Sequence, residues 1–154
     1  MNARGFTLVE TMVAISIVAV ALTALAQLFL IAAQADIDAR RASFSSILAT
    51  QKLEELRSLG ADLGAQGSAL LNSNIAGACD FLDEYGRSLG TGASPLPGTV
   101  YIRRWSVEAI SSDPDTFVVQ VAVLPRRWST GPAASDARAL GGAQIVTVKT
   151  RRAG

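Results

Sequence analysis

An uninterrupted apolar run near the start of the chain constrains its fold more than any other feature. Residues 12–33 form a stretch of 22 residues without a charge, a proline or a glycine. At about 1.5 Å per residue, a helix of that length spans about 33 Å, enough to cross a hydrocarbon core of about 30 Å. A secretory signal has a shorter apolar core that ends at small residues, whereas this run continues into a polar helical pattern. We therefore expect one helix that crosses a membrane.

An acidic residue lies just before this run. Glu10 ends the stretch Arg-Gly-Phe-Thr-Leu-Val-Glu at residues 4–10. A carboxylate without a partner near the centre of a bilayer costs about 2.5–3.5 kcal/mol on insertion scales, so an acid beside a spanning segment indicates a function and a partner. The alternative is that Glu10 lies among lipid headgroups and is solvated. Its position alone does not decide between the two interpretations.

Residues 4–10 and the apolar segment after them resemble the prepilin signature, the class III signal of type IV pilin-like proteins. The resemblance combines a short basic leader, Gly5 before Phe6, the acid at Glu10 and an uncharged span. It implies that a prepilin peptidase cuts between Gly5 and Phe6 on the cytoplasmic side and that Phe6 is then N-methylated. It also implies an assembly salt bridge, in which Glu10 neutralises the terminal amine of a neighbouring subunit. Such a pair would set the axial register, because opposite charges attract far more strongly in a low-dielectric layer than in water.

The same resemblance implies a domain organisation. Residues 1–5 are the expected leader peptide, residues 6–35 the transmembrane and assembly helix, and residues 36–154 a periplasmic globular domain. Charge counting leaves the orientation open, since Arg4 lies on one side of the apolar run and Arg40 and Arg41 on the other. The cytoplasmic N-terminus therefore follows from the resemblance. The expected location is the bacterial inner membrane, followed by the periplasm or a cell-surface filament.

The remaining sequence predicts an α+β fold. Residues 34–59 lack Gly and Pro, so we expect one continuous helix over about residues 6–59 with Gly60 as its C-cap. Its second half carries apolar residues at helical spacing, while Leu53 lies off this stripe. The members of the stripe are Ile37, Phe44, Ile47, Leu48, Leu56 and Leu59.

Alternating apolar residues predict strands at 100–110, 116–124 and 144–150. Residues 111–115, Ser-Ser-Asp-Pro-Asp, predict the hairpin turn between the first two. Residues 61–97 and 125–142 read as loops, the former with one short element around residues 81–89. The expected architecture is a long N-terminal helix, with a transmembrane first half, packed on a three- to four-stranded antiparallel sheet. That is also the pilin arrangement.

The composition weighs against catalysis. Histidine is absent and Cys79 is the only cysteine, so the chain has no Ser/His or Cys/His dyad and no intramolecular disulfide. Fourteen basic and thirteen acidic residues give a net charge of +1. A charge this small predicts no strong electrostatic attraction of the chain to nucleic acid. We expect no enzymatic activity, no cofactor and no nucleic-acid partner. Cys79 is interpreted as a small packed side chain.

Three further groups of residues have a functional and a structural interpretation. The acids Asp80, Asp83 and Glu84 could bind calcium, as some secretion pseudopilins do, but we interpret them as solvated turn residues around Gly86. Four arginine pairs could bind DNA, as in some competence pilins, but we interpret them as parts of solvated surfaces. The pairs are Arg40-Arg41, Arg103-Arg104, Arg126-Arg127 and Arg151-Arg152. We expect Trp105 in the core and Trp128 in a loop, where it could make a contact.

Within the family we interpret the chain as a minor pilin. The anchor lacks the midway proline of many major pilins, and a single cysteine cannot close their C-terminal disulfide loop. Residues 49–57 resemble PilV-type minor pilins and the related I-type pseudopilins of type II secretion. The expected partners are a prepilin peptidase, the major pilin, other minor pilins and the inner-membrane assembly platform. A minor pseudopilin and a membrane-anchored binding module that never polymerises remain as alternatives.

Overall fold

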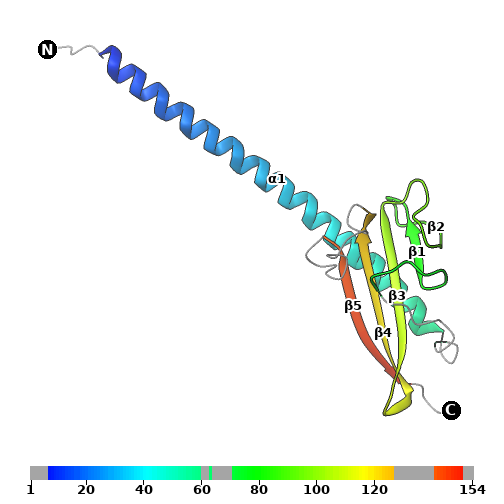
Figure 1. Ribbon diagram of the computed structural model, residues 1–154. Coiled ribbons are helices and arrows are strands. Elements are labelled where there is room, and N and C mark those ends of the chain that lie inside the picture. The colour runs from blue at the N-terminus through cyan, green and yellow to red at the C-terminus, as the bar shows by residue number, and fades with distance from the viewer. Residues whose placement is uncertain (1–6, 60–62, 64–70, 127–140, 151–154) are drawn as a thin grey trace. The chain divides into compact units, whose positions relative to one another are not determined.

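The computed structural model of the protein describes residues 7–59, 63, 71–126 and 141–150. Contacts within the chain divide it into two compact units, Met1–Asp38 and Ala39–Gly154. Helix α1 (Leu8–Ser58), 51 residues long, contributes its first part to one unit and its last part to the other (Figure 1). The predicted continuous helix is therefore confirmed, while its predicted C-cap at Gly60 lies outside the described residues.

The second unit contains an antiparallel sheet of five strands. They are β1 (Cys79–Leu82), β2 (Ser88–Gly90), β3 (Tyr101–Ile110), β4 (Asp113–Pro125) and β5 (Ala143–Thr150), in the spatial order β2-β1-β3-β4-β5. The α+β class and the three long strands are confirmed. The strand count is higher than expected because β1 and β2 form a short hairpin where the sequence indicated a single element. Strands of four and three residues are too short to show alternation.

The main core lies between the last part of α1 and one face of the sheet (Figure 1). The helix buries Ser45, Leu48, Ala49, Lys52, Leu53 and Leu56. This stripe differs from the predicted one. Leu53 is only 6% exposed, whereas Ile47 is 63% exposed and points away from the sheet. Residues 45, 49, 52, 53 and 56 keep the helical spacing of three to four, and Ile47 falls outside it.

A smaller apolar cluster covers the other face of the sheet. It contains Cys79, Phe81 and Ile102, all fully buried. Phe81 pairs with Ile102 across β1 and β3, and both lie on the face opposite Tyr101, because neighbouring strand residues point to opposite sides. The Cys79 thiol donates to the carbonyl of Gly92 at 3.3 Å, so the chain after β2 folds over this cluster. The interpretation of Cys79 as a packed side chain is confirmed.

Candidate functional site

Only part of the predicted N-terminal site falls on described residues. Gly5 and Phe6, the expected cleavage and methylation positions, lie outside them. Glu10 lies in the first turn of α1 and is exposed. Its backbone N–H donates to the Thr7 hydroxyl oxygen at 3.3 Å, which makes Thr7 the N-cap and Glu10 the third helical residue. A negative charge in the first turn interacts favourably with the helix dipole and so stabilises the helix. Glu10 therefore has a local structural role besides the predicted one.

The first part of α1 presents apolar side chains that the described chain leaves uncovered. The segment is long and apolar enough to cross a membrane, and none of its most apolar stretch is buried. A core helix of a soluble domain would instead be packed against the rest of the molecule. Ser16 and Thr23 donate their hydroxyls to the carbonyls of Met12 and Ala19 at 2.8 Å. These bonds satisfy hydroxyl groups that would otherwise be costly in lipid.

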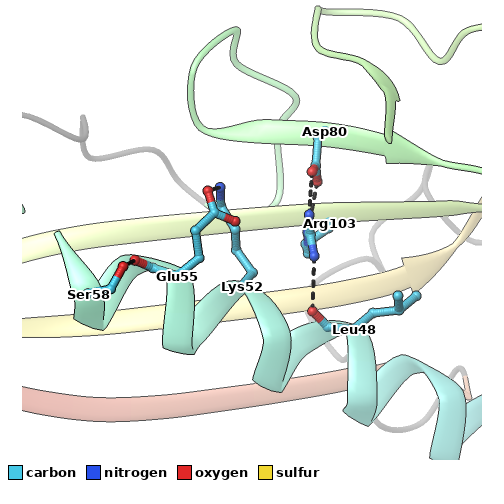
Figure 2. Close-up of polar contacts among 6 residues, drawn as sticks. All are labelled: Leu48, Lys52, Glu55, Ser58, Asp80 and Arg103. Atoms are coloured by element: carbon cyan, nitrogen blue, oxygen red, sulfur yellow. Dashed lines mark hydrogen bonds and ion pairs between the residues drawn. The ribbon is translucent and has the colours of Figure 1, made fainter. Parts of the chain in front are cut away.

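Asp80, one of the candidate calcium ligands, belongs to a buried ion pair with Arg103. Arg103 donates through Nη2 and Nε to the two carboxylate oxygens of Asp80 at 2.6 and 3.0 Å, and through Nη1 to the Leu48 carbonyl at 3.2 Å (Figure 2). The two side chains are only 7% and 11% exposed. The interpretation of Asp80 as a solvated turn acid is therefore wrong. Arg103 interrupts the apolar face of its strand, and a charge in such a place signals a buried partner.

The neighbouring acids Asp83 and Glu84 lie in a turn. One Asp83 carboxylate oxygen accepts the backbone N–H groups of Tyr85 and Arg87 at 2.9 and 2.8 Å. Gly86 has a φ of +80°, which favours glycine. The predicted turn around Gly86 is confirmed, and among the described residues no group of three or more metal-binding side chains is close enough to hold an ion. The exposed Glu84 raises the pKa of the Tyr85 hydroxyl by accepting its hydrogen bond.

The predicted arginine pairs do not form one basic surface. Arg103 and Arg104 are 6% and 2% exposed, so both the DNA-binding and the solvated interpretation are wrong for this pair. Arg104 donates to the Asn74 side chain and the Leu71 carbonyl, both at 2.9 Å. Its burial lowers the pKa of its guanidinium. Arg127 and the pair Arg151-Arg152 lie outside the described residues.

One predicted aromatic position is confirmed and the other is untested. Trp105 is 6% exposed and belongs to the main core. The Lys52 ammonium lies 4.1 Å from the centre of its ring and pairs with Glu55 at 2.7 Å (Figure 2 shows the Lys52–Glu55 pair). The aromatic face and the Glu55 carboxylate both attract the Lys52 ammonium and so offset part of the water that it loses at this position. Trp128 lies outside the described residues.

Comparison with known proteins identifies the N-terminal segment. Residues 1–26 match the family model of the prokaryotic N-terminal methylation motif, the signal of type IV prepilin-like proteins. Neither a curated protein nor a solved structure matches the chain. The chain therefore carries the signal of a type IV pilin-like or pseudopilin protein, and its long apolar helix with an antiparallel sheet is a pilin-like α+β arrangement.

Proposed function

We propose that this chain is a minor type IV pilin of the PilV type, a structural subunit that primes a type IV pilus or is incorporated into it. The observation that carries the proposal is the methylation motif at residues 1–26, joined to a helix whose apolar part the described chain leaves uncovered. A helix of that kind must be covered by lipid or by other apolar helices. A filament subunit uses both environments in turn, first the membrane and then the filament core.

Three residues carry the proposed processing and assembly. The peptidase cuts between Gly5 and Phe6, and the new amine of Phe6 is methylated. Glu10 then pairs with the Phe6 amine of a neighbouring subunit. The exposed Glu10 side chain supports this role, since the local cap uses the Glu10 backbone N–H and leaves the carboxylate at the helix surface. A subunit out of register would leave both charges unpaired in a low-dielectric layer, which is costly.

The proposed topology has a cytoplasmic leader of residues 1–5, a transmembrane and assembly helix at residues 6–35, and a periplasmic domain at residues 36–154. The partners are a prepilin peptidase, the inner-membrane assembly platform, the major pilin and other minor pilins. The subunit starts in the inner membrane and ends in the periplasm or in a surface filament. No catalytic role belongs to this proposal.

The first test is the intact mass of the protein co-expressed with an active prepilin peptidase. We expect loss of residues 1–5 and the gain of one methyl group on Phe6. The variant Gly5→Leu should stay uncut, because its side chain would clash where glycine has none. An uncut wild-type chain beside a processed control prepilin would contradict the proposal and leave a membrane-anchored module.

A second test separates processing from assembly. Glu10→Gln removes the charge while keeping the size of the side chain, and we expect normal cleavage with loss of the subunit from purified filaments. Glu54→Gln is the matched control, because Glu54 is an exposed glutamate on the same helix whose carboxylate pairs with Arg57 of its own chain at 3.0 Å. Equal incorporation of both variants would exclude the assembly role of Glu10. Incorporation into a secretion pseudopilus instead of a pilus would favour the pseudopilin alternative.

A further inference from the structure

The two edges of the sheet differ in length and regularity (Figure 1). At one edge β2 has only three residues, and the pairing of β1 with it shifts register between Phe81 and Leu82. At the other edge β5 has eight residues, all paired with β4 in one continuous register. Short strands and irregular pairing protect sheet edges from other chains. The β2 edge has this protection and the β5 edge lacks it, and among the described residues no strand pairs with the outer side of β5.

The side chains of β5 make this edge apolar on one face. Val146 and Val148 are 56% and 59% exposed and lie on the face opposite the main core, because the residue between them pairs with the core residue Val119. Lysine often protects an exposed edge, and Lys149 is the only charged residue of β5. Its ammonium donates to the Arg57 carbonyl of α1, on the other face of the sheet. No charge of β5 therefore lies beside the two valines.

The sequence of β5 is complementary to an antiparallel copy of itself. With a twofold axis through Thr147, Val146 of each copy lies opposite Val148 of the other, on the exposed face. The other opposed pairs are Gln144 with Thr150 and Ile145 with Lys149. None of these pairs brings like charges together. An axis through either valine would instead place the other valine opposite a polar side chain, so apolar pairing selects Thr147 as the centre.

We propose that β5 is an interface for a second copy of this chain, in which two sheets join edge to edge through antiparallel β5 strands centred on Thr147. The outward N–H and C=O groups of β5 pair with those of the second copy, and these main-chain hydrogen bonds hold the two sheets together. The opposed valines fix the register. The interface lies wholly within the unit Ala39–Gly154. It goes beyond the proposed function and requires neither cleavage nor Glu10.

Cysteine cross-linking tests the register in membranes that contain the full-length chain without other pilins. Opposite residues of paired strands have Cα atoms about 4.5–5.5 Å apart, within the range that a disulfide spans. Co-expressed, differently tagged Val146→Cys and Val148→Cys chains should form a mixed disulfide dimer under a mild oxidant. Its yield should be several times that of either variant alone, because identical positions lie diagonally, about 7–8 Å apart. The native Cys79 is fully buried, and the wild-type chain gives its background.

A pair of charged variants tests whether the partner is a second copy. The double variant Val146→Lys with Val148→Lys places lysines of the two copies opposite each other, and we expect loss of co-purification of two differently tagged full-length chains in mild detergent. The matched control is Val146→Lys with Val148→Glu, which removes the same two valines but places opposite charges across the interface. We expect this variant to co-purify, because its charges attract only when the partner is the same strand in antiparallel orientation.

Equal cross-linking of Ile47→Cys chains would overturn the proposal, because Ile47 is an exposed residue of α1 away from β5 and reports random collisions. Equal co-purification of both charged variants would place the contact outside β5 and overturn it as well, as would wild-type chains that do not co-purify. Circular dichroism verifies that each variant is folded. Neither experiment includes a prepilin peptidase, so failed pairing contradicts this inference alone, and an uncut chain contradicts the pilin function alone.

Discussion

At the residue scale, the Asp80–Arg103 pair links three elements. Asp80 lies on β1, Arg103 on β3, and the third arginine hydrogen bond reaches the Leu48 carbonyl on α1. Removing two charges from water is costly, and only close pairing with further hydrogen bonds offsets that cost. The pair therefore contributes little net stability compared with an apolar pair, but it penalises any packing in which the partners do not meet.

This arrangement predicts an asymmetric response to mutation. Asp80→Ala leaves a buried guanidinium without its counter-charge and should destabilise the second unit by about 3–5 kcal/mol. The double variant Asp80→Leu with Arg103→Met should recover most of that loss, because no charge remains buried. Urea unfolding of the full chain in mild detergent, followed by tryptophan fluorescence, measures both.

The matched control is Glu54→Ala, which breaks a surface pair with Arg57 whose side chains are 60% and 51% exposed. Such a pair is worth about 0–1 kcal/mol. Losses of equal size for Asp80→Ala and Glu54→Ala would contradict the assignment of Asp80–Arg103 as a buried pair.

At the scale of elements, α1 has two neighbouring residues with opposite surroundings. Leu48 is 3% exposed in the core against the sheet, and Ile47 is 63% exposed. The difference follows from the helix, because a step of one residue turns the side chain by about 100°. The apolar Ile47 thus lies on the helix face that the described chain leaves open.

The two positions should respond differently to truncation. Leu48→Ala should cost about 2–5 kcal/mol of unfolding free energy, through lost burial and the cavity left behind. Ile47→Ala should change it by less than about 0.5 kcal/mol, as for other surface substitutions. Chemical unfolding of the two variants side by side measures the difference, and a comparable loss at Ile47 would place that residue in the core instead.

At the scale of the whole molecule, the two units require different surroundings. The unit Ala39–Gly154 buries its apolar residues against its own sheet, whereas Met1–Asp38 leaves large apolar side chains exposed, Leu22 at 61% and Phe29 at 74%. Hydrophobic burial is the main force that folds the former. The latter needs lipid or other apolar helices around it. One continuous helix can belong to both units because it satisfies its own backbone hydrogen bonds in an apolar environment as well as in water.

Membrane insertion should therefore depend on the first unit alone. The double variant Leu22→Arg with Ala26→Arg places two charges within the apolar run, at a cost of about 2.5–3.5 kcal/mol each at a helix centre. We expect its alkali-resistant membrane fraction to fall sharply. The apolar control Leu22→Val with Ala26→Leu should stay in the membrane, and equal extraction of both would argue against a spanning helix.

Local patterns in the sequence are enough to predict the helix and the long strands. Helical spacing and strand alternation are properties of neighbouring residues, so the uninterrupted helix and β3, β4 and β5 follow from the amino-acid order alone. The methylation signal at residues 1–26 is equally local and is recognisable from the residues around Glu10. The turn at Gly86 also depends on a few adjacent residues.

The tertiary structure decided which of these residues meet. Strand register paired Asp80 with Arg103, which lie on different strands, and so converted two expected surface charges into a buried pair. The face of α1 that packs on the sheet buries Leu53 and leaves Ile47 exposed. The sequence by itself determined the elements and the apolar anchor, because both follow from local periodicity; contacts between distant residues were decided only when the elements packed.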